Sequence, residues 1–236
     1  MADASAALVL PLVLLAAALH ASWNALVKAG GDRLAVQALV MLAPALVAAP
    51  FLLILPFPGA AALPFLLASV TLHLVYNALL VAAYRHGDLS QVYPIARGSA
   101  PLLVAIGAWV VAGEEKSSAE MLAILIVSLG ILALSYRRGP RRHGESQSVF
   151  LAFLVGLSIA AYSLTDGLGA RSASSLMSYI AWLFFLEGTV FFLIIAGLRR
   201  GRFVKSIKPV LLPGLGGGLM AGLAYAIVIW AMTMAP

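Results

Sequence analysis

Residues 73–101 read HLVYNALLVAAYRHGDLSQVYPIARGSAP, and they join two long apolar runs through a short polar turn. The first run extends back to about residue 63, and the second extends forward to about residue 112. A helix that crosses the hydrocarbon core of a bilayer needs about 20 apolar residues at a rise of about 1.5 Å each. The stretch therefore predicts two membrane-spanning helices joined by a tight turn. It also carries two histidines, three tyrosines, an asparagine and two arginines, which are costly to place in hydrocarbon.

The whole chain has the composition of an integral membrane protein. Of its 236 residues, 63% are hydrophobic and 10% are charged, and the mean hydropathy is +1.03. A soluble domain holds roughly 25% charged residues, so this chain has too few to cover a water-facing surface. The net charge of +6 falls mainly in short connections between apolar runs, so we explain it by membrane topology and expect no nucleic-acid partner. The chain has no cysteine, which excludes disulfides, thiolate nucleophiles and cysteine-based metal sites.

Eight apolar segments are long enough to span a bilayer. The first is not a signal peptide, because it lacks a basic start and its apolar run continues to about Lys28. The connections are short, and we expect no separate soluble domain. The expected fold is therefore all-α, a polytopic bundle of about eight transmembrane helices. The predicted spans are Leu8–Ala29, Leu34–Leu55, Leu63–Tyr84, Gln91–Ala112, Ala119–Tyr136, Val149–Gly169, Leu176–Leu198 and Pro209–Met234.

The lysines and arginines are distributed unevenly between these connections. The connections after the first, third, fifth and seventh spans hold 12 of them, whereas those after the fourth and sixth hold only Lys116 and Arg171. Because short cytoplasmic loops are rich in basic residues, the odd-numbered connections are predicted to be cytoplasmic and the N-terminus to lie outside. We expect an integral protein of the bacterial inner membrane.

Two pairs of segments resemble each other and indicate an internal repeat. When Tyr76 is aligned with Tyr225, the third span resembles the eighth. The motif HASWNALVKAG near the end of the first span likewise resembles AAYSLTDGLGAR near the end of the sixth. Because five is an odd number, a first half of five helices would make the second half start from the opposite side of the membrane. Such an inverted repeat is common in transporters. The predicted parts are a first repeat at 1–140, a basic cytoplasmic loop at 141–148 and an incomplete second repeat of three helices at 149–236.

With ALHASWNALVKAGGD at 18–32 and AYRHGDLSQVYPIARGSAPLLVAIGAWVVAGE at 83–114, the chain resembles the EamA family of the drug/metabolite transporter superfamily. The resemblance covers essentially the whole chain. It implies ten helices in two five-helix halves around a central cavity that moves small metabolites. Against that pattern, the partners of the fourth and fifth helices are missing after Pro236, so we expect a missing C-terminal segment or a homodimer. The family usually has both termini in the cytoplasm, whereas the charges here place the N-terminus outside.

Polar and aromatic side chains follow helical spacing within several predicted spans. His73, Tyr76 and Asn77 share one face, because residues three and four apart lie together on a helix. Since ionisable groups in hydrocarbon usually face the bundle interior or a wet cavity, we expect these stripes to converge on a polar cavity. The alternative is that each residue only joins neighbouring helices, for about 0.6–2 kcal/mol. The predicted substrate-cavity residues are His20, Trp23, Asn24, His73, Tyr76, Asn77, Tyr84, Tyr93, Arg97, Tyr162, Asp166 and Tyr225.

Arg97, Asp166 and Glu187 are charged residues that lie inside the predicted spans. Arg97 lies near the start of its helix and Asp166 near the end of a helix that runs in the same direction, so straight helices would separate them by roughly 15 Å. We predict no direct pair; Arg97 is expected to snorkel toward the cytoplasmic side and to capture an anionic group there. Glu187 lies near the middle of the seventh span, where a carboxylate serves either in proton coupling or in structural pairing.

The chain carries no recognisable catalytic motif. It has neither the GxxxxGK[ST] loop of nucleotide hydrolysis nor an HExxH metal site, so we expect no enzyme activity, no cofactor and no metal. Our hypothesis is a secondary transporter that moves a small polar metabolite across the bilayer, as export or uptake, by alternating access. Two alternatives stay open. One is a non-transporting remnant or assembly subunit, and the other is an integral-membrane enzyme that acts on lipid-linked substrates.

Overall fold

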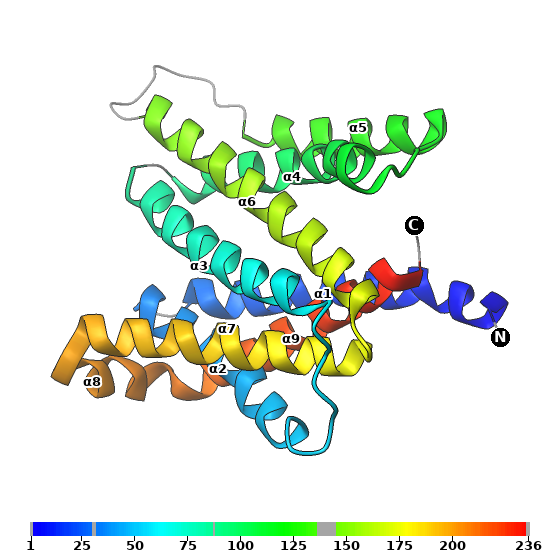
Figure 1. Cartoon of the computed structure of the whole chain (residues 1–236). Coiled ribbons are helices and arrows are strands. Elements are labelled where there is room, and N and C mark those ends of the chain that lie inside the picture. The colour runs from blue at the N-terminus through cyan, green and yellow to red at the C-terminus, as the bar shows by residue number, and fades with distance from the viewer. Residues whose placement is uncertain (1, 30–31, 87, 136–144, 235–236) are drawn as a thin grey trace. The chain divides into compact units, whose positions relative to one another are not determined.

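The chain is mainly helical in the part that a computed structural model describes (Figure 1). No strand occurs among those residues, so the predicted all-α class is confirmed. The described residues are 2–29, 32–86, 88–135 and 145–234, and the side chains at 2–7, 25, 27–29, 84, 89, 112 and 145 lie outside the description.

In these described ranges, eight long α-helices coincide with the eight predicted segments. They differ from the prediction mainly at their ends; for example, α2 ends at Phe51 rather than near residue 55. Short helical segments, which the sequence analysis did not predict, join α7 to α9. The bounds are α1 Ala2–Ala29, α2 Arg33–Phe51, α3 Leu63–His86, α4 Leu89–Ala112, α5 Ser118–Ala133, α6 Glu145–Ser172, α7 Leu176–Arg199, η1 Arg200–Arg202, α8 Phe203–Ile207, η2 Lys208–Val210 and α9 Leu211–Met234.

Local sequence signals explain several of these helix ends. Gly113 adopts a left-handed conformation with φ of +67° after α4, which a residue without Cβ does at little cost. Ser117 and Glu120 form a capping box at the start of α5: the Glu120 carboxylate accepts the Ser117 backbone N–H at 2.7 Å. At α2, the side chain of Asp32 caps the helix by accepting the N–H of Ala35 at 3.2 Å.

The helices form two compact units. One comprises Met1–Val70 and Gly167–Pro236, and the other comprises Thr71–Asp166. The division falls within α3 and within α6, so each of these helices contributes to both units. The predicted repeats at 1–140 and 149–236 stay a prediction.

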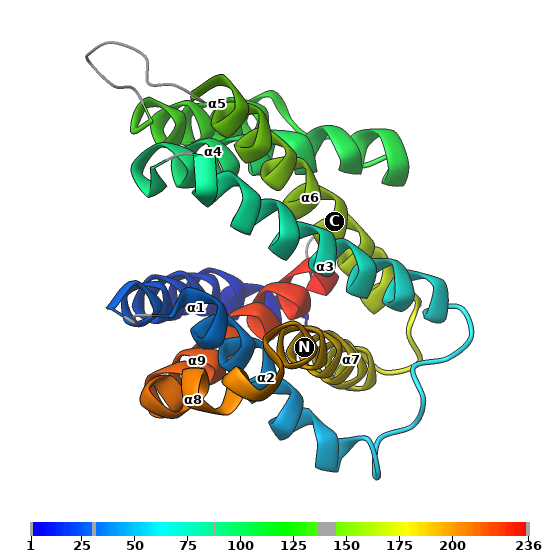
Figure 2. The same cartoon turned by 90° about the vertical axis from the view of Figure 1, so that its left-hand side faces the viewer.

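In the first unit, α2 lies between α7 and α9, and α1 packs along α9 (Figure 2). The α2–α9 interface depends on glycines spaced four residues apart, because a helix presents such residues on one face. A Cβ at Gly214 would lie 2.7 Å from the Leu39 side chain, and one at Gly218 would lie 2.5 Å from the Val40 carbonyl oxygen. One turn later, a Cβ at Gly222 would lie 2.7 Å from the Pro44 ring. The absence of side chains on this stripe therefore allows the two helices to approach closely.

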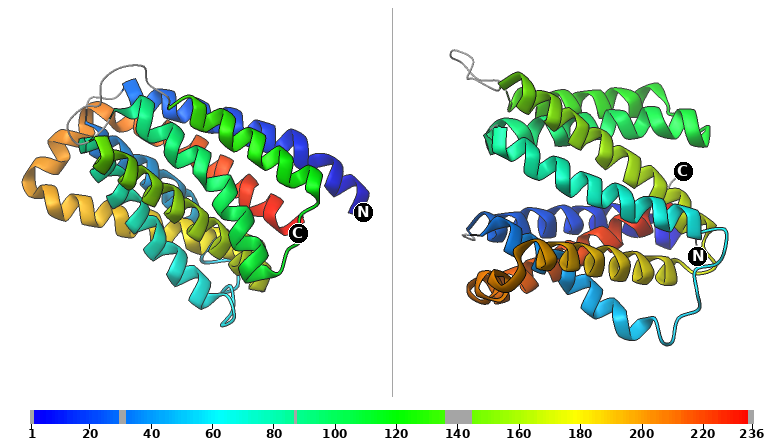
Figure 3. Two further views of the ribbon diagram at one scale, coloured as in Figure 1. Left: turned by 90° about the horizontal axis from the view of Figure 1, so that it is seen from above. Right: turned by 60° about the vertical axis from the view of Figure 1, so that its left-hand side comes forward.

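In the second unit, α4 packs on α5 (Figure 3) and also contacts α6. The segment IARGSAP provides both contacts. A Cβ at Gly98 would lie 3.0 Å from the backbone nitrogen of Leu132 in α5. A Cβ at Gly156 of α6 would lie 2.9 Å from the carbonyl oxygen of Ala96 and would overlap the Ser99 hydroxyl. Small residues in the quoted stretch thus mark the places where two other helices cross α4.

Several helices are long and apolar enough to cross a membrane, which is the property of an integral membrane protein. By length and composition, the described residues contain 5 candidate spans, and the last of them includes both α7 and α9. Leu8–Asn24 and Ser118–Ala133 are apolar but shorter. Eight spans in an inverted repeat, with the N-terminus outside, stay a prediction. The candidates are Arg33–Phe51, Leu63–Ala83, Ser90–Val111, Ser146–Ser172 and Leu176–Met234.

Candidate functional site

A cluster of polar aromatic rings joins α3 to α6 in the second unit. The His73 ring stacks on the Tyr162 ring with centroids 4.0 Å apart and an interplanar angle of 24°. Tyr76 meets the edge of the same tyrosine at 5.7 Å and 78°. His73 and Tyr162 are buried, with exposed fractions of 6% and 7%. Two predicted cavity residues on separate helices, His73 and Tyr162, are therefore in direct contact.

Asn77 belongs to the same face of α3, and its side-chain amide is anchored locally. The amide nitrogen donates a hydrogen bond to the carbonyl oxygen of His73, four residues earlier, at 2.8 Å. The side chain is 3% exposed. This bond fixes the orientation of the amide on the face of α3 that also carries His73.

The candidate residues on α1 repeat this local pattern. Asn24 donates to the carbonyl oxygen of His20 at 2.7 Å, and the Trp23 indole N–H donates to Nδ1 of His20 at 3.3 Å. HASWN and HLVYN thus share a His-x-x-aromatic-Asn arrangement with the same back-bonded asparagine. Trp23 also packs against a buried apolar cluster of the first unit that includes Leu39 and Val40. Packing alone therefore explains the tryptophan at position 23.

On α4, the guanidinium of Arg97 lies over the Tyr93 ring at 5.7 Å from its centroid. A cation over an aromatic face gains about 0.5–2 kcal/mol. Tyr93 lies one turn closer to the start of α4, so Arg97 extends toward that end of the helix, as snorkelling requires. The prediction that Arg97 and Asp166 do not pair stays untested.

Three further candidates lie on α6, α7 and α9. Asp166 is fully buried one turn beyond Tyr162 on α6. Tyr225 stacks on Phe184 at 6.4 Å in the first unit, and Glu187 is buried on α7 with 5% exposed. The side chain of Tyr84 lies outside the described residues. Convergence of all these residues on one cavity stays a prediction.

The sequence analysis missed Ser158, which is buried one turn before Tyr162. Ser158, Tyr162 and Asp166 follow i, i+4, i+8, so the helical spacing that selected the two later residues could also have found the first. Its hydroxyl donates to the carbonyl oxygen of Val155 at 2.8 Å. That local bond satisfies the donor and leaves the hydroxyl oxygen as an acceptor on the stripe.

This arrangement can bind a polar molecule but offers no metal site. Stacked imidazole and phenol rings present π faces and N–H and O–H groups, and Asn77 adds an amide of fixed orientation on the same face of α3. In the described part of the chain, no three His, Asp or Glu side chains are grouped to hold a metal ion.

Comparison with known proteins does not assign the chain to a family. No family model matches it, and no curated protein matches it. The resemblance to the EamA family therefore stays a prediction.

Proposed function

We propose that this chain is a secondary transporter that moves a small polar metabolite across the membrane. The observation that carries the proposal is the buried contact between His73 and Tyr162 on two apolar helices. Polar groups at membrane depth are expensive, and they are retained mainly in substrate or ion pathways and at helix contacts.

The cluster has the chemistry of a recognition site for a polar molecule. A binding site usually combines apolar walls with a few fixed polar groups. Here α3 and α6 supply the apolar walls. The imidazole of His73 and the phenols of Tyr76 and Tyr162 supply donors, acceptors and ring faces, while Asn77 is held in place by its bond to His73.

The organisation of the chain suits alternating access. The Thr71–Asp166 unit is continuous in sequence, and the chain enters it within α3 and leaves it within α6. The candidate residues His73 and Tyr162 lie close to these two junctions in sequence. A movement between the units would therefore act on the helices that carry the cluster, which is how transporters couple a site to rocking of their halves.

Replacing His73 by phenylalanine is expected to reduce substrate-dependent flux by about 5- to 150-fold. The ring stack is kept, while the hydrogen bonds that the imidazole would make to a substrate, worth about 1–3 kcal/mol, are lost. The measurement is uptake into proteoliposomes that contain the full chain, screened with labelled amino acids and other small metabolites. His86→Phe is the matched control, because His86 is exposed at the end of α3 and should leave flux unchanged.

The outcomes separate the hypotheses. Flux that depends on His73 but not on His86 supports transport through the α3–α6 cluster. Equal flux in the wild type and the His73 variant would contradict this site. No flux for any compound, in a chain that is folded and correctly inserted, would favour the non-transporting subunit.

A further inference from the structure

A cluster of cations lies between α7 and α9. Five basic residues occur within residues 199–208, the segment that comprises the end of α7, η1, α8 and the start of η2. Such a density of charge cannot stay in hydrocarbon. Because α7 and α9 are long apolar helices on either side, the 199–208 segment must lie at the water–lipid interface. The five residues are Arg199, Arg200, Arg202, Lys205 and Lys208.

One of the five cations is neutralised within the protein. Arg199 donates to both carboxylate oxygens of Asp32, with Nη2 at 2.8 Å from Oδ1, and its Nη1 also donates to the Ser206 hydroxyl at 3.1 Å. Arg200, Arg202, Lys205 and Lys208 are exposed, and within the described ranges none of them has an ion-pair partner. Four positive charges therefore face outward from a fixed segment.

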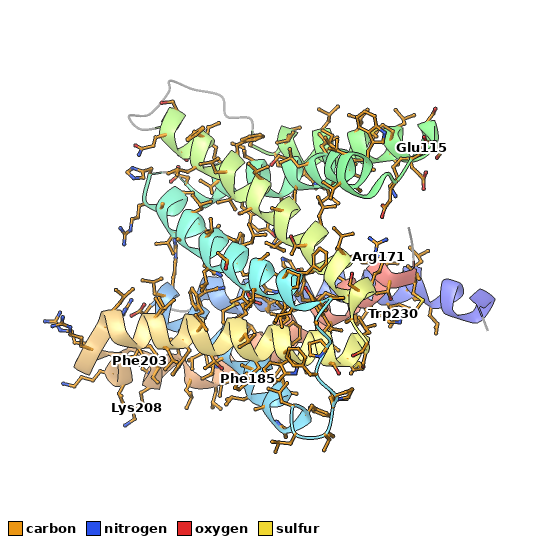
Figure 4. The ribbon with its side chains drawn as sticks, in the orientation of Figure 1. Glu115, Arg171, Phe185, Phe203, Lys208 and Trp230 are labelled. Carbon is orange, nitrogen blue, oxygen red and sulfur yellow. The ribbon has the colours of Figure 1, made fainter. Side chains whose placement is uncertain are left out.

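Packing holds the backbone of this segment against α7 and α2. Phe203 is 6% exposed and meets the Phe192 ring edge-on at 5.0 Å. Val210 joins the apolar cluster formed by α2. Figure 4 shows Phe203 and Lys208 together at this end of α7. The four cations therefore project from an ordered support rather than from a free loop.

Exposed apolar side chains accompany the exposed charges. Leu198 is 76% exposed, Val204 is 67% exposed and Leu212 is 81% exposed. Apolar groups beside cations are the composition of a surface that enters the headgroup region of a bilayer. The apolar side chains would contact acyl chains, while the lysine and arginine heads reach the phosphates.

The backbone at Arg200 is a second, independent observation. Its φ is +47°, a conformation that glycine adopts freely and that other residues adopt only with backbone strain. Glycine is present at the next position, Gly201, but not at Arg200 itself. The sequence thus keeps a cation where glycine would relax the backbone, which indicates that the charge at this position is used.

We propose that the four exposed cations Arg200, Arg202, Lys205 and Lys208, with the apolar side chains beside them, form a binding site for the headgroups of anionic phospholipids. Arg199 is a positioning residue, since its bonds to Asp32 and Ser206 fix the backbone that carries the four. The ligand is a phosphodiester headgroup with a net negative charge, such as that of phosphatidylglycerol. Each lysine or arginine near an anionic surface strengthens binding by about fivefold.

The test uses the purified full chain in a neutral detergent with added phosphatidylglycerol or phosphatidylcholine, and it measures the thermal unfolding midpoint. Phosphatidylglycerol is expected to raise the midpoint by several degrees and phosphatidylcholine is not, because a ligand that binds only the folded state stabilises it. Replacing the four cations by glutamine should weaken the apparent affinity for phosphatidylglycerol by at least about tenfold. The charge-matched control replaces Arg137, Arg138, Arg141 and Arg142 by glutamine.

The control and two further arms decide the result. An equal loss in both quadruple variants would overturn the site, since the effect would then be one of net charge. An equal gain with inorganic phosphate would also overturn it, since the ligand would then be a free anion. If the quadruple variant fails to fold, the wild type still tests the proposal, because 1 M NaCl must abolish the phosphatidylglycerol effect.

A single substitution gives the sharpest outcome. Arg200→Gly should raise the unfolding midpoint without lipid, because the strained φ is relieved, and should lower the gain from phosphatidylglycerol. A rise in both the unfolding midpoint without lipid and the gain from phosphatidylglycerol would contradict a role for the Arg200 charge.

Discussion

Gly218→Ala is expected to destabilise the folded chain by about 1–3 kcal/mol, the usual range for overpacking a close contact. The new Cβ would lie 2.5 Å from the Val40 carbonyl oxygen and 2.7 Å from the Ala43 Cβ. The first of these is a backbone atom, which cannot rotate away as the end of a side chain can. Helices α9 and α2 would therefore have to separate along the whole glycine stripe.

Gly216→Ala is the matched control on the same helix. No atom lies within 4 Å of a Cβ built at Gly216, so alanine there adds helix propensity without a clash. We expect this variant to be neutral or more stable by about 0.4–1 kcal/mol. The measurement is thermal unfolding in a neutral detergent, where 1 kcal/mol corresponds to roughly 2–4 °C in a chain of this size. Equal midpoints for the two variants would contradict the close packing of α9 on α2.

The opposite side of α2 offers the same comparison. A Cβ at Gly188 of α7 would lie 2.2 Å from the Met41 carbonyl oxygen, whereas one at Gly197 would meet nothing within 4 Å. Gly188→Ala should therefore destabilise and Gly197→Ala should not. Val40 and Met41 are adjacent on α2, so the double variant Gly188→Ala/Gly218→Ala should depart from additivity.

The glycine stripe shows how far the sequence could predict packing. The pair Gly218 and Gly222 has the spacing that permits close helix approach, and Gly214 extends it by one turn. Spacing identifies the face of α9 that makes contact. It does not identify α2 as the partner, because that choice depends on which neighbouring helix has a surface that fits the glycine stripe.

The candidate site was also only partly predictable from the sequence. Helical spacing placed His73, Tyr76 and Asn77 on one face of α3, and Tyr162 on a face of α6. The stack of Tyr162 on His73 links residues far apart in sequence, and no local pattern encodes that pairing. Local chemistry was more informative for Asn24 and Asn77, since an asparagine four residues after a carbonyl can bond back to it wherever the helix packs.

The short helical segments after α7 were missed for a physical reason. Residues 199–208 are too basic for a span, and a charged connection between two spans is typical of an open loop. Phe203 packs on α7 and Val210 packs on α2, and these tertiary contacts outweigh the local composition.

Arg199→Gln is expected to destabilise the chain by about 1–2 kcal/mol at pH 7. The substitution removes a guanidinium that donates to both oxygens of Asp32, and charge-assisted hydrogen bonds of this kind contribute about 1.5–3 kcal/mol when buried. The effect is smaller here because both side chains are only partly buried, with exposed fractions of 26% and 31%. The measurement is again the unfolding midpoint.

Asparagine and alanine at Asp32 separate its two roles. Asp32→Asn keeps an N-cap oxygen for Ala35 but loses the charge, so it should resemble Arg199→Gln. Asp32→Ala loses the cap as well and should cost about 1 kcal/mol more. The double variant Asp32→Asn/Arg199→Gln should be at most about 0.5 kcal/mol less stable than either single variant, because both substitutions remove the same interaction.

Acid should remove the same interaction without a mutation. The hydrogen bond from Arg199 is the main cause that holds the pKa of Asp32 below its ordinary value of 3.8, and burial opposes it. The unfolded chain therefore takes up this proton first as the pH falls. The contribution of Asp32 to stability is present above about pH 4, and it is lost as the pH falls through the folded-state pKa, which lies below 3.8. Arg199→Gln should consequently lose less stability between pH 5 and pH 3 than the wild type loses. Equal acid sensitivity in both chains would mean that Asp32 and Arg199 are not paired, and that the 199–208 segment is held in place by Phe203 and Val210 alone.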